Sequence, residues 1–150
     1  RINVISEEKS WSKKLKKKES LFNNICKHFP KKFRFLNKKV YLTLLLSNNK
    51  NIKILNKKFR KKNKTTDVLS FPYYDPSKTR IKLKLNKNIY LGDIVINLYK
   101  IDKRKIKFES EFNKLWVHGL VHLLGYKHYK NKDFIEMMKV ENKIIKQLKC

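Results

Sequence analysis

Short apolar runs separated by polar stretches predict four β-strands in this chain. In residues 1–5, apolar and polar positions alternate, which is the two-residue period of a half-buried strand. Three later runs are short and apolar, and polar residues or a proline follow them. The predicted strands are residues 1–5, Val40–Ser47, Asp67–Phe71 and Tyr90–Asn97.

Between these runs, apolar residues recur every three to four positions, which is the spacing of one helix face. Serine, asparagine and aspartate favour helix starts, and a proline follows the end of the first helix. The segment 73–89 carries Pro76 and many lysines, so it favours a surface loop or hairpin. The predicted helices are Ser10–Phe29, a helix capped by Asn48, the largely apolar segment Glu109–Leu124, and a last helix begun by a capping box of Asp133 and Glu136.

Strands that alternate with helices place the chain in the α/β class. With 150 residues, the chain is most simply a single domain, long enough to bury a core. We expect a small, mostly parallel four-stranded sheet packed with helices. The apolar helix Glu109–Leu124 should be buried against that sheet.

The composition is that of a folded protein without a membrane anchor. Hydrophobic residues make up 41% of the chain, and no apolar run approaches the length of a membrane span. The first residues show no signal-peptide pattern, and Cys26 and Cys150 form no CxxC pair. We therefore expect a cytoplasmic protein in a reducing compartment.

The formal charge is +27, from 39 basic and 12 acidic residues. A field of this sign attracts a polyanion, which makes nucleic acid the expected partner. The chain is also rich in lysine, asparagine and isoleucine and contains no alanine, as the coding bias of an AT-rich genome would produce. The charge therefore indicates nucleic acid without indicating which one.

Three of the four histidines fall within eleven residues, at His118, His122 and His128. Histidines four positions apart share one face of a helix. Gly125 is suited to end that helix and let the chain return, so that the third ring reaches the same point. Three imidazoles predict a single divalent ion, zinc first, with an open fourth position. The alternative is that the histidines are packed separately in the core.

Four blocks of this sequence resemble the YbeY family of bacterial endoribonucleases, the rRNA maturation factors. They are the histidine block His118–His128, the segment Thr66–Pro72, the segment Leu91–Ile94, and the residues Leu55-Asn56 with Phe59-Arg60. The order and spacing of the blocks agree with the family from about residue 40 to the C-terminus. The first 40 residues agree only in general layout.

The resemblance implies a metal-dependent endoribonuclease directed at single-stranded RNA. The family processes the 3′ end of small-subunit rRNA and acts in ribosome quality control, which implies rRNA and the ribosomal subunit as partners. By the same resemblance, residues 1–150 form one such domain. His118, His122 and His128 match the zinc ligands, and Arg60 matches an arginine needed for activity.

One position departs from the family pattern: Lys127 stands where the family has an aspartate before the last histidine. An aspartate there could orient a ligand ring, whereas a charged lysine accepts no hydrogen bond. We therefore expect either weaker activity or weaker metal affinity, or another acid in that role. Asp67 and Asp93 are candidates for that role or for a general base, although each could instead stabilise a turn or a bulge.

The mechanism that these residues predict is hydrolysis of a phosphodiester. A three-histidine zinc can lower the pKa of its water to about 7. The guanidinium of Arg60 offers a planar set of donors that matches a phosphate. Three aromatic residues near the histidines could stack bases, although core packing suits them as well: Phe112, Trp116 and Tyr126.

Two other functions are compatible with the histidine pattern. Metzincin peptidases share the spacing HExxHxxGxxH, but Gly119 occupies the position of their general base. A non-catalytic rRNA-binding assembly factor with a structural metal would explain Lys127 and the lack of an obvious base. The predicted RNase differs from both by cutting RNA in a metal-dependent way.

Overall fold

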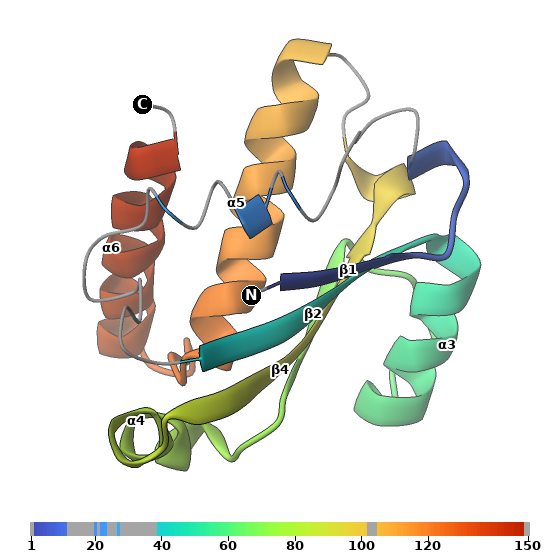
Figure 1. The fold of residues 1–150 in the computed structure, drawn as a ribbon. Helices are drawn as coiled ribbons and strands as arrows, with labels where there is room; N and C mark the ends of the chain where they lie inside the picture. Colours follow the sequence, from blue (N-terminus) through green and yellow to red (C-terminus); the bar gives the residue numbers. More distant parts are fainter. Residues whose placement is uncertain are drawn as a thin grey trace.

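The computed structural model describes residues 2–11, 20, 22, 23, 27, 39–101 and 105–148. From β2 to α5, strands and helices alternate along the chain, as the sequence predicts (Figure 1). In chain order the elements are β1 (Ile2–Ser6), β2 (Lys39–Ser47), α3 (Asn49–Arg60), β3 (Val68–Pro72), α4 (Pro76–Leu85), β4 (Asn88–Asn97), a 3-10 turn (Leu98–Lys100), α5 (Lys105–Leu123) and α6 (Asn131–Leu148).

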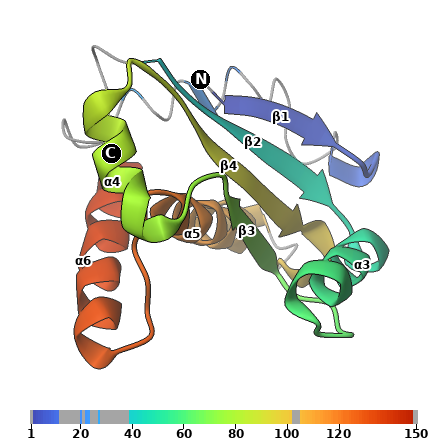
Figure 2. The ribbon, with the colours of Figure 1, turned by 90° about the horizontal axis from the view of Figure 1, so that it is seen from below.

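The four strands form one sheet in the order β1-β2-β4-β3. β1, β2 and β4 run parallel, and β3 pairs antiparallel with β4 at the edge of the sheet. The α/β class and the mostly parallel four-stranded sheet are therefore confirmed. The short β3 edge matters for function because it runs beside α5, which carries two of the histidines (Figure 2).

The sheet buries both of its faces around β4, where successive residues point in opposite directions. Ile94 and Ile96 belong to the main core, which lies between the sheet and α5. Val95 faces the other way and packs with Ile52 of α3 and Leu69 of β3. The predicted burial of the apolar helix against the sheet is confirmed, since Trp116 and Val117 of α5 are fully buried.

The helix capped by Asn48 is also confirmed. The side-chain oxygen of Asn48 accepts a hydrogen bond of 2.9 Å from the backbone N–H of Asn51. At the other end, Lys61 adopts a left-handed conformation, and its N–H bonds to the carbonyl of Lys57. These two ends fix the length of α3 and hence the place of Arg60, its last residue.

The expectation of a loop or hairpin over residues 73–89 is wrong, because Pro76–Leu85 forms helix α4. Asp75 caps this helix by accepting the backbone N–H of Ser77 at 2.9 Å, and Pro76 stands at the first helical position, where its missing N–H costs nothing. The hydrogen bonds from Ser77 also lower the pKa of Asp75. The lysines of this segment obscured the Asp-Pro start signal.

Two helix starts differ from the predictions by a turn or less. α5 begins at Lys105 rather than Glu109, and α6 begins at Asn131, so Asp133 lies in its first turn instead of capping it. Most of the predicted helix Ser10–Phe29 lies outside the described residues. Among the helices that are described, none combines the length and apolarity needed to cross a membrane.

Candidate functional site

Helix α5 and the turn after it carry the three histidines. His118 and His122 lie on α5, and the helix ends in a Schellman motif in which Tyr126 N–H bonds to the Val121 carbonyl at 3.2 Å. Gly125 supplies the left-handed residue of that motif, with φ of +98°. A Cβ at this glycine would lie 2.8 Å from the Pro76 carbonyl oxygen, so a larger residue would be strained there. The chain turns back and brings His128 to the other two rings.

The three imidazoles converge as the sequence predicts. One ring nitrogen from each of His118, His122 and His128 lies within 4.8 Å of the others. The Nε2 atoms of His118 and His122 are 3.2 Å apart. Two nitrogens bound to one tetrahedral zinc at about 2.0–2.1 Å are about 3.3–3.4 Å apart. The three histidines are therefore placed to bind a metal ion, and the alternative of separately packed rings is excluded.

Hydrogen-bond partners at the other ring nitrogen, Nδ1, orient the imidazoles of His118 and His122. His118 Nδ1 lies 2.7 Å from Glu141 Oε1 of α6, and His122 Nδ1 lies 3.1 Å from the Tyr126 carbonyl oxygen. A carbonyl only accepts, so His122 Nδ1 carries the proton and its Nε2 presents a lone pair to the common point. Such outer partners fix ligand rings in known metal sites.

The surroundings of His122 favour the neutral form of its ring. Burial, and then the neighbouring His118, lower the pKa of His122 to about 4. His122 is therefore neutral at pH 7, which is the form that binds a metal ion.

Gly119 sets the depth at which α5 rests on the sheet. A Cβ at this position would lie 2.7 Å from Ile94 Cγ2 and 3.2 Å from Ser70 Oγ. The helix can therefore approach β3 and β4 closely only with glycine here. A glutamate, as a metzincin base would require, has no room at this position.

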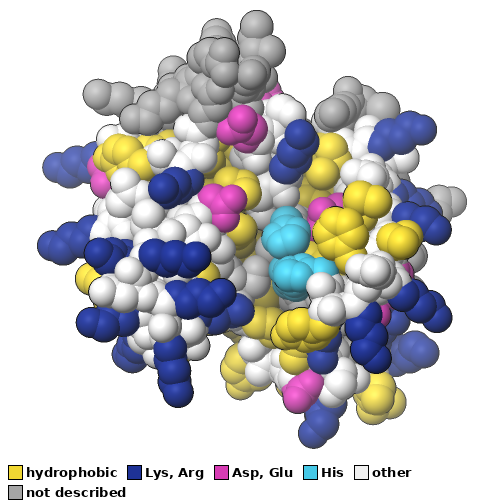
Figure 3. Space-filling model, turned by 180° about the vertical axis from the view of Figure 1, so that it is seen from behind, with side chains coloured by type: hydrophobic (Ala, Val, Ile, Leu, Met, Phe, Trp, Pro, Cys, Tyr) yellow, Lys and Arg dark blue, Asp and Glu magenta, His cyan; other side chains and the backbone are white. Residues whose placement is uncertain are grey.

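Arg60 reaches the same cleft as the histidines from the other side of β3. Its Nη2 donates a 2.7 Å hydrogen bond to the Ser70 carbonyl oxygen, and its guanidinium lies 5.9 Å from the centre of the Phe71 ring. The cleft has a volume of about 650 Å³ and is lined by Arg60, Lys62, Lys127 and the three histidines, among others. In the space-filling view the histidines lie in a hollow between two basic parts of the surface (Figure 3).

The other predicted candidates lie elsewhere. Neither Asp67 nor Asp93 is among the described residues that line this cleft. Asp93 follows the β-bulge at Gly92, as the alternative reading expected, and accepts a short hydrogen bond from the Tyr90 hydroxyl. Asp67 contributes its carbonyl, which accepts the N–H of Asn97. Both aspartates thus have local structural contacts.

Two of the three base-stacking candidates are packing residues. Phe112 and Trp116 are buried, as core packing required. Tyr126 lines the cleft, but it packs against the core, and the Arg80 guanidinium covers its ring at 4.5 Å.

Sequence reasoning missed Glu141, the acid that contacts His118. It lies 23 residues beyond that histidine on another helix, and no spacing rule connects the two. The only signal was indirect: Lys127 precedes the last histidine, and another acid in the orienting role was one of the two expectations that this lysine raised.

Comparisons with known proteins agree with the geometry. The model of the family described as Endoribonuclease YbeY matches residues 3–149. A relative of that name from Pelagibacter ubique (strain HTCC1062) is 50% identical over 153 residues, covering 99% of this chain and 96% of the relative. Another, from Ehrlichia canis (strain Jake), is 34% identical over 144 residues, covering 93% and 88%. A solution structure of a Thermotoga maritima protein matches with a TM-score of 0.60 at 25% identity, covering 99% of this chain and 89% of that one. The chain therefore belongs to the YbeY family of endoribonucleases.

Proposed function

We propose that this protein is a zinc-dependent, single-strand-specific endoribonuclease of the cytoplasm that processes the 3′ end of small-subunit rRNA and acts in ribosome quality control. Residues 1–150 form its single catalytic domain. The observation that carries the proposal is the convergence of three imidazole nitrogens in a basic cleft of a chain from an endoribonuclease family.

His118, His122 and His128 would hold the ion. An all-imidazole set suits zinc, and the neutral state of His122 prepares it for binding. When bound, the ion supplies Lewis acidity and lowers the pKa of water from about 15.7 to about 7. The protein's own part is to hold the rings at one point through Glu141 and the Tyr126 carbonyl.

Arg60 stabilises the negative charge that develops on the phosphate. The bond to the Ser70 carbonyl uses one of the five N–H donors of a guanidinium and fixes the direction of the group. The fixed, exposed group can then meet phosphate oxygens with its other donors. Lys62 and Lys127 line the same cleft and attract the backbone without reading its sequence.

The test is cleavage of single-stranded and duplex RNA, with metal content measured on the same preparations. The wild type should contain about one zinc ion per chain, should cut the single strand, and should stop when chelated. His122→Ala should lose both metal and cleavage. Loss of metal with unchanged cleavage would contradict the proposal, and tight RNA binding without cleavage under any divalent ion would favour the assembly factor instead.

Arg60→Ala should separate charge stabilisation from docking. Removal of a donor that acts in the transition state lowers kcat by about 10²- to 10³-fold. Lys62→Ala is the matched control, because this neighbouring cation of the cleft should change KM more than kcat. Steady-state cleavage kinetics decide the point, and equal losses of binding and rate in Arg60→Ala would make Arg60 a docking residue.

A further inference from the structure

Two tyrosines of the cleft are exposed to solvent to an unusual degree. Tyr73, just after β3, has 66% of its surface exposed, and Tyr129, just after the last histidine, has 84%. Both line the cleft that contains the three imidazoles. Large exposed aromatic rings in a cleft are typical of binding sites, because the fold gains little from leaving them in water.

The ring of Tyr73 is held in place although it is exposed. It lies 5.1 Å from the ring of Tyr74 and 5.8 Å from that of Tyr90, and both neighbours stand nearly perpendicular to it, at 88° and 82°. Edge-to-face contacts of this kind orient a ring. A ring that is already oriented loses little conformational entropy when a flat ligand stacks on it.

The ring of Tyr129 lies beside a cation and a candidate metal ligand. Its centre is 5.9 Å from Lys127 Nζ and 6.4 Å from the centre of the His128 ring. A nucleotide presents a flat base and an anionic phosphate together. An exposed ring can stack on the base, and the lysine beside it can meet the phosphate.

The other aromatic rings of the cleft are less suited to this role. The Tyr126 ring is covered by Arg80 at 4.5 Å. Tyr74 is half-buried and packs against the ring of Tyr73. Tyr73 and Tyr129 are the two tyrosines of the cleft that are also large exposed hydrophobic residues.

We propose that Tyr73 and Tyr129 are stacking platforms for unpaired bases of the RNA that occupies this cleft. This inference rests on the proposed function. The charge of the cleft argues for RNA rather than a protein partner, since its described lining includes Arg60, Lys62 and Lys127 against a single acid, Asp75.

The platforms explain a preference for single strands. Stacking on an aromatic ring is open to every base, so it selects no sequence. In a duplex the bases are already paired and stacked, and an RNA helix hides their faces. Only an unpaired strand can place its bases on the two rings.

The test compares binding of two 2′-O-methyl oligonucleotides by fluorescence anisotropy: an oligouridylate, and an abasic strand of equal length and charge. A gel run after each titration checks that both strands are still intact. Tyr73→Ala and Tyr129→Ala should each weaken oligouridylate binding by about ten-fold. Neither should change binding of the abasic strand. Tyr73→Phe and Tyr129→Phe keep the ring and should bind as the wild type does. Phe134→Ala removes an exposed aromatic residue that does not line the cleft, and it should have no effect.

Two outcomes would overturn the platforms: unchanged oligouridylate binding in both alanine variants, or equal losses for the two strands. Cleavage of unmodified oligouridylate by the same wild-type preparation tests the proposed function separately. Base-dependent losses without any cleavage would support the platforms and reject the nuclease. Normal cleavage without base-dependent losses would support the nuclease and reject the platforms. Far-ultraviolet circular dichroism checks that every variant is folded.

Discussion

At the scale of single residues, the contact between Glu141 and His118 ties a candidate metal ligand to a neighbouring helix. Glu141 Oε1 lies 2.7 Å from His118 Nδ1, and the carboxylate side chain is 20% exposed. A carboxylate in this position accepts a hydrogen bond from Nδ1–H, which leaves the lone pair of Nε2 directed toward the ion. Glu141 thus orients the ring of His118 from another helix.

Glu141→Ala should therefore weaken zinc binding by about 10- to 100-fold. Glu141→Gln keeps an acceptor oxygen without the charge, so its loss should be smaller. Competition with a chromophoric chelator measures both affinities. The control is Glu136→Gln on the same helix, because Glu136 pairs with Arg80 at 3.7 Å on the surface and should leave zinc affinity unchanged. Equal zinc affinity in Glu141→Ala and the wild type would refute the orienting role.

At the scale of elements, the close packing of α5 on the sheet brings the histidines near the edge strand β3, which Arg60 contacts through the Ser70 carbonyl. Gly119 permits that approach. Ser70 of β3 then contacts both α5 and Arg60 of α3. Its hydroxyl lies 3.4 Å from the Gly119 carbonyl oxygen, and its own carbonyl accepts from Arg60. The distance between α5 and β3 therefore determines how far the imidazoles lie from the Arg60 guanidinium.

Gly119→Ala tests this packing because two effects of opposite sign compete. Alanine favours a helix interior over glycine by about 1 kcal/mol. The added methyl would lie 2.7 Å from Cγ2 of the fully buried Ile94, and overpacking of this kind costs about 1–3 kcal/mol. We expect a net loss in the free energy of unfolding, measured by urea denaturation.

A double-mutant cycle with Ile94→Ala supplies the control for Gly119→Ala. Ile94→Ala removes the methyl group that the new side chain would meet, so the two changes should be less costly together than their sum. Stabilisation by Gly119→Ala alone would show that α5 has room to spare against β4.

The elements that the sequence predicts well are those in which the local pattern and the tertiary environment agree. The apolar runs became the strands, and the spacing of His118, His122 and Gly125 predicted a converging site because one helix and one turn determine it. α4 was missed since the lysines of residues 73–89 outweighed the Asp75-Pro76 start signal. The contacts of Glu141 with His118 and of Tyr73 with Tyr90 join segments far apart in sequence, which local patterns do not encode.

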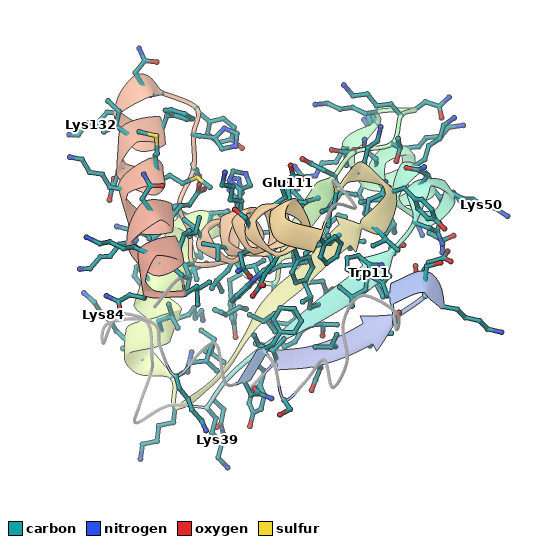
Figure 4. The ribbon with its side chains drawn as sticks, turned by 90° about the horizontal axis from the view of Figure 1, so that it is seen from above. Trp11, Lys39, Lys50, Lys84, Glu111 and Lys132 are labelled. Carbon is teal, nitrogen blue, oxygen red and sulfur yellow. The ribbon has the colours of Figure 1, made fainter. Side chains whose placement is uncertain are left out.

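At the scale of the whole molecule, the charge of +27 has two possible origins: RNA binding and drift of surface positions to lysine. The side chains of Lys39, Lys50, Lys84 and Lys132 project from different sides of the molecule, whereas Trp11 lies inside, between α5 and the sheet (Figure 4). Lysines spread in this way cannot all contact one strand. The cations that line the cleft, Arg60, Lys62 and Lys127, are the ones placed to do so.

The salt dependence of RNA binding distinguishes the cations that contact RNA phosphates from the other lysines of the surface. Each phosphate contact on a single strand contributes about −0.7 to the slope of log K against log salt concentration, so three cleft cations predict a slope of about −2. Lys62→Ala should reduce that slope by about 0.7, whereas Lys50→Ala, on the exposed face of α3 outside the cleft, should leave it unchanged. Anisotropy titrations of the 2′-O-methyl oligouridylate over a range of salt concentrations measure both values. A wild-type slope several times steeper, reduced equally by both variants, would mean that RNA follows the general basic surface, because counterion release would then come from lysines all around the molecule.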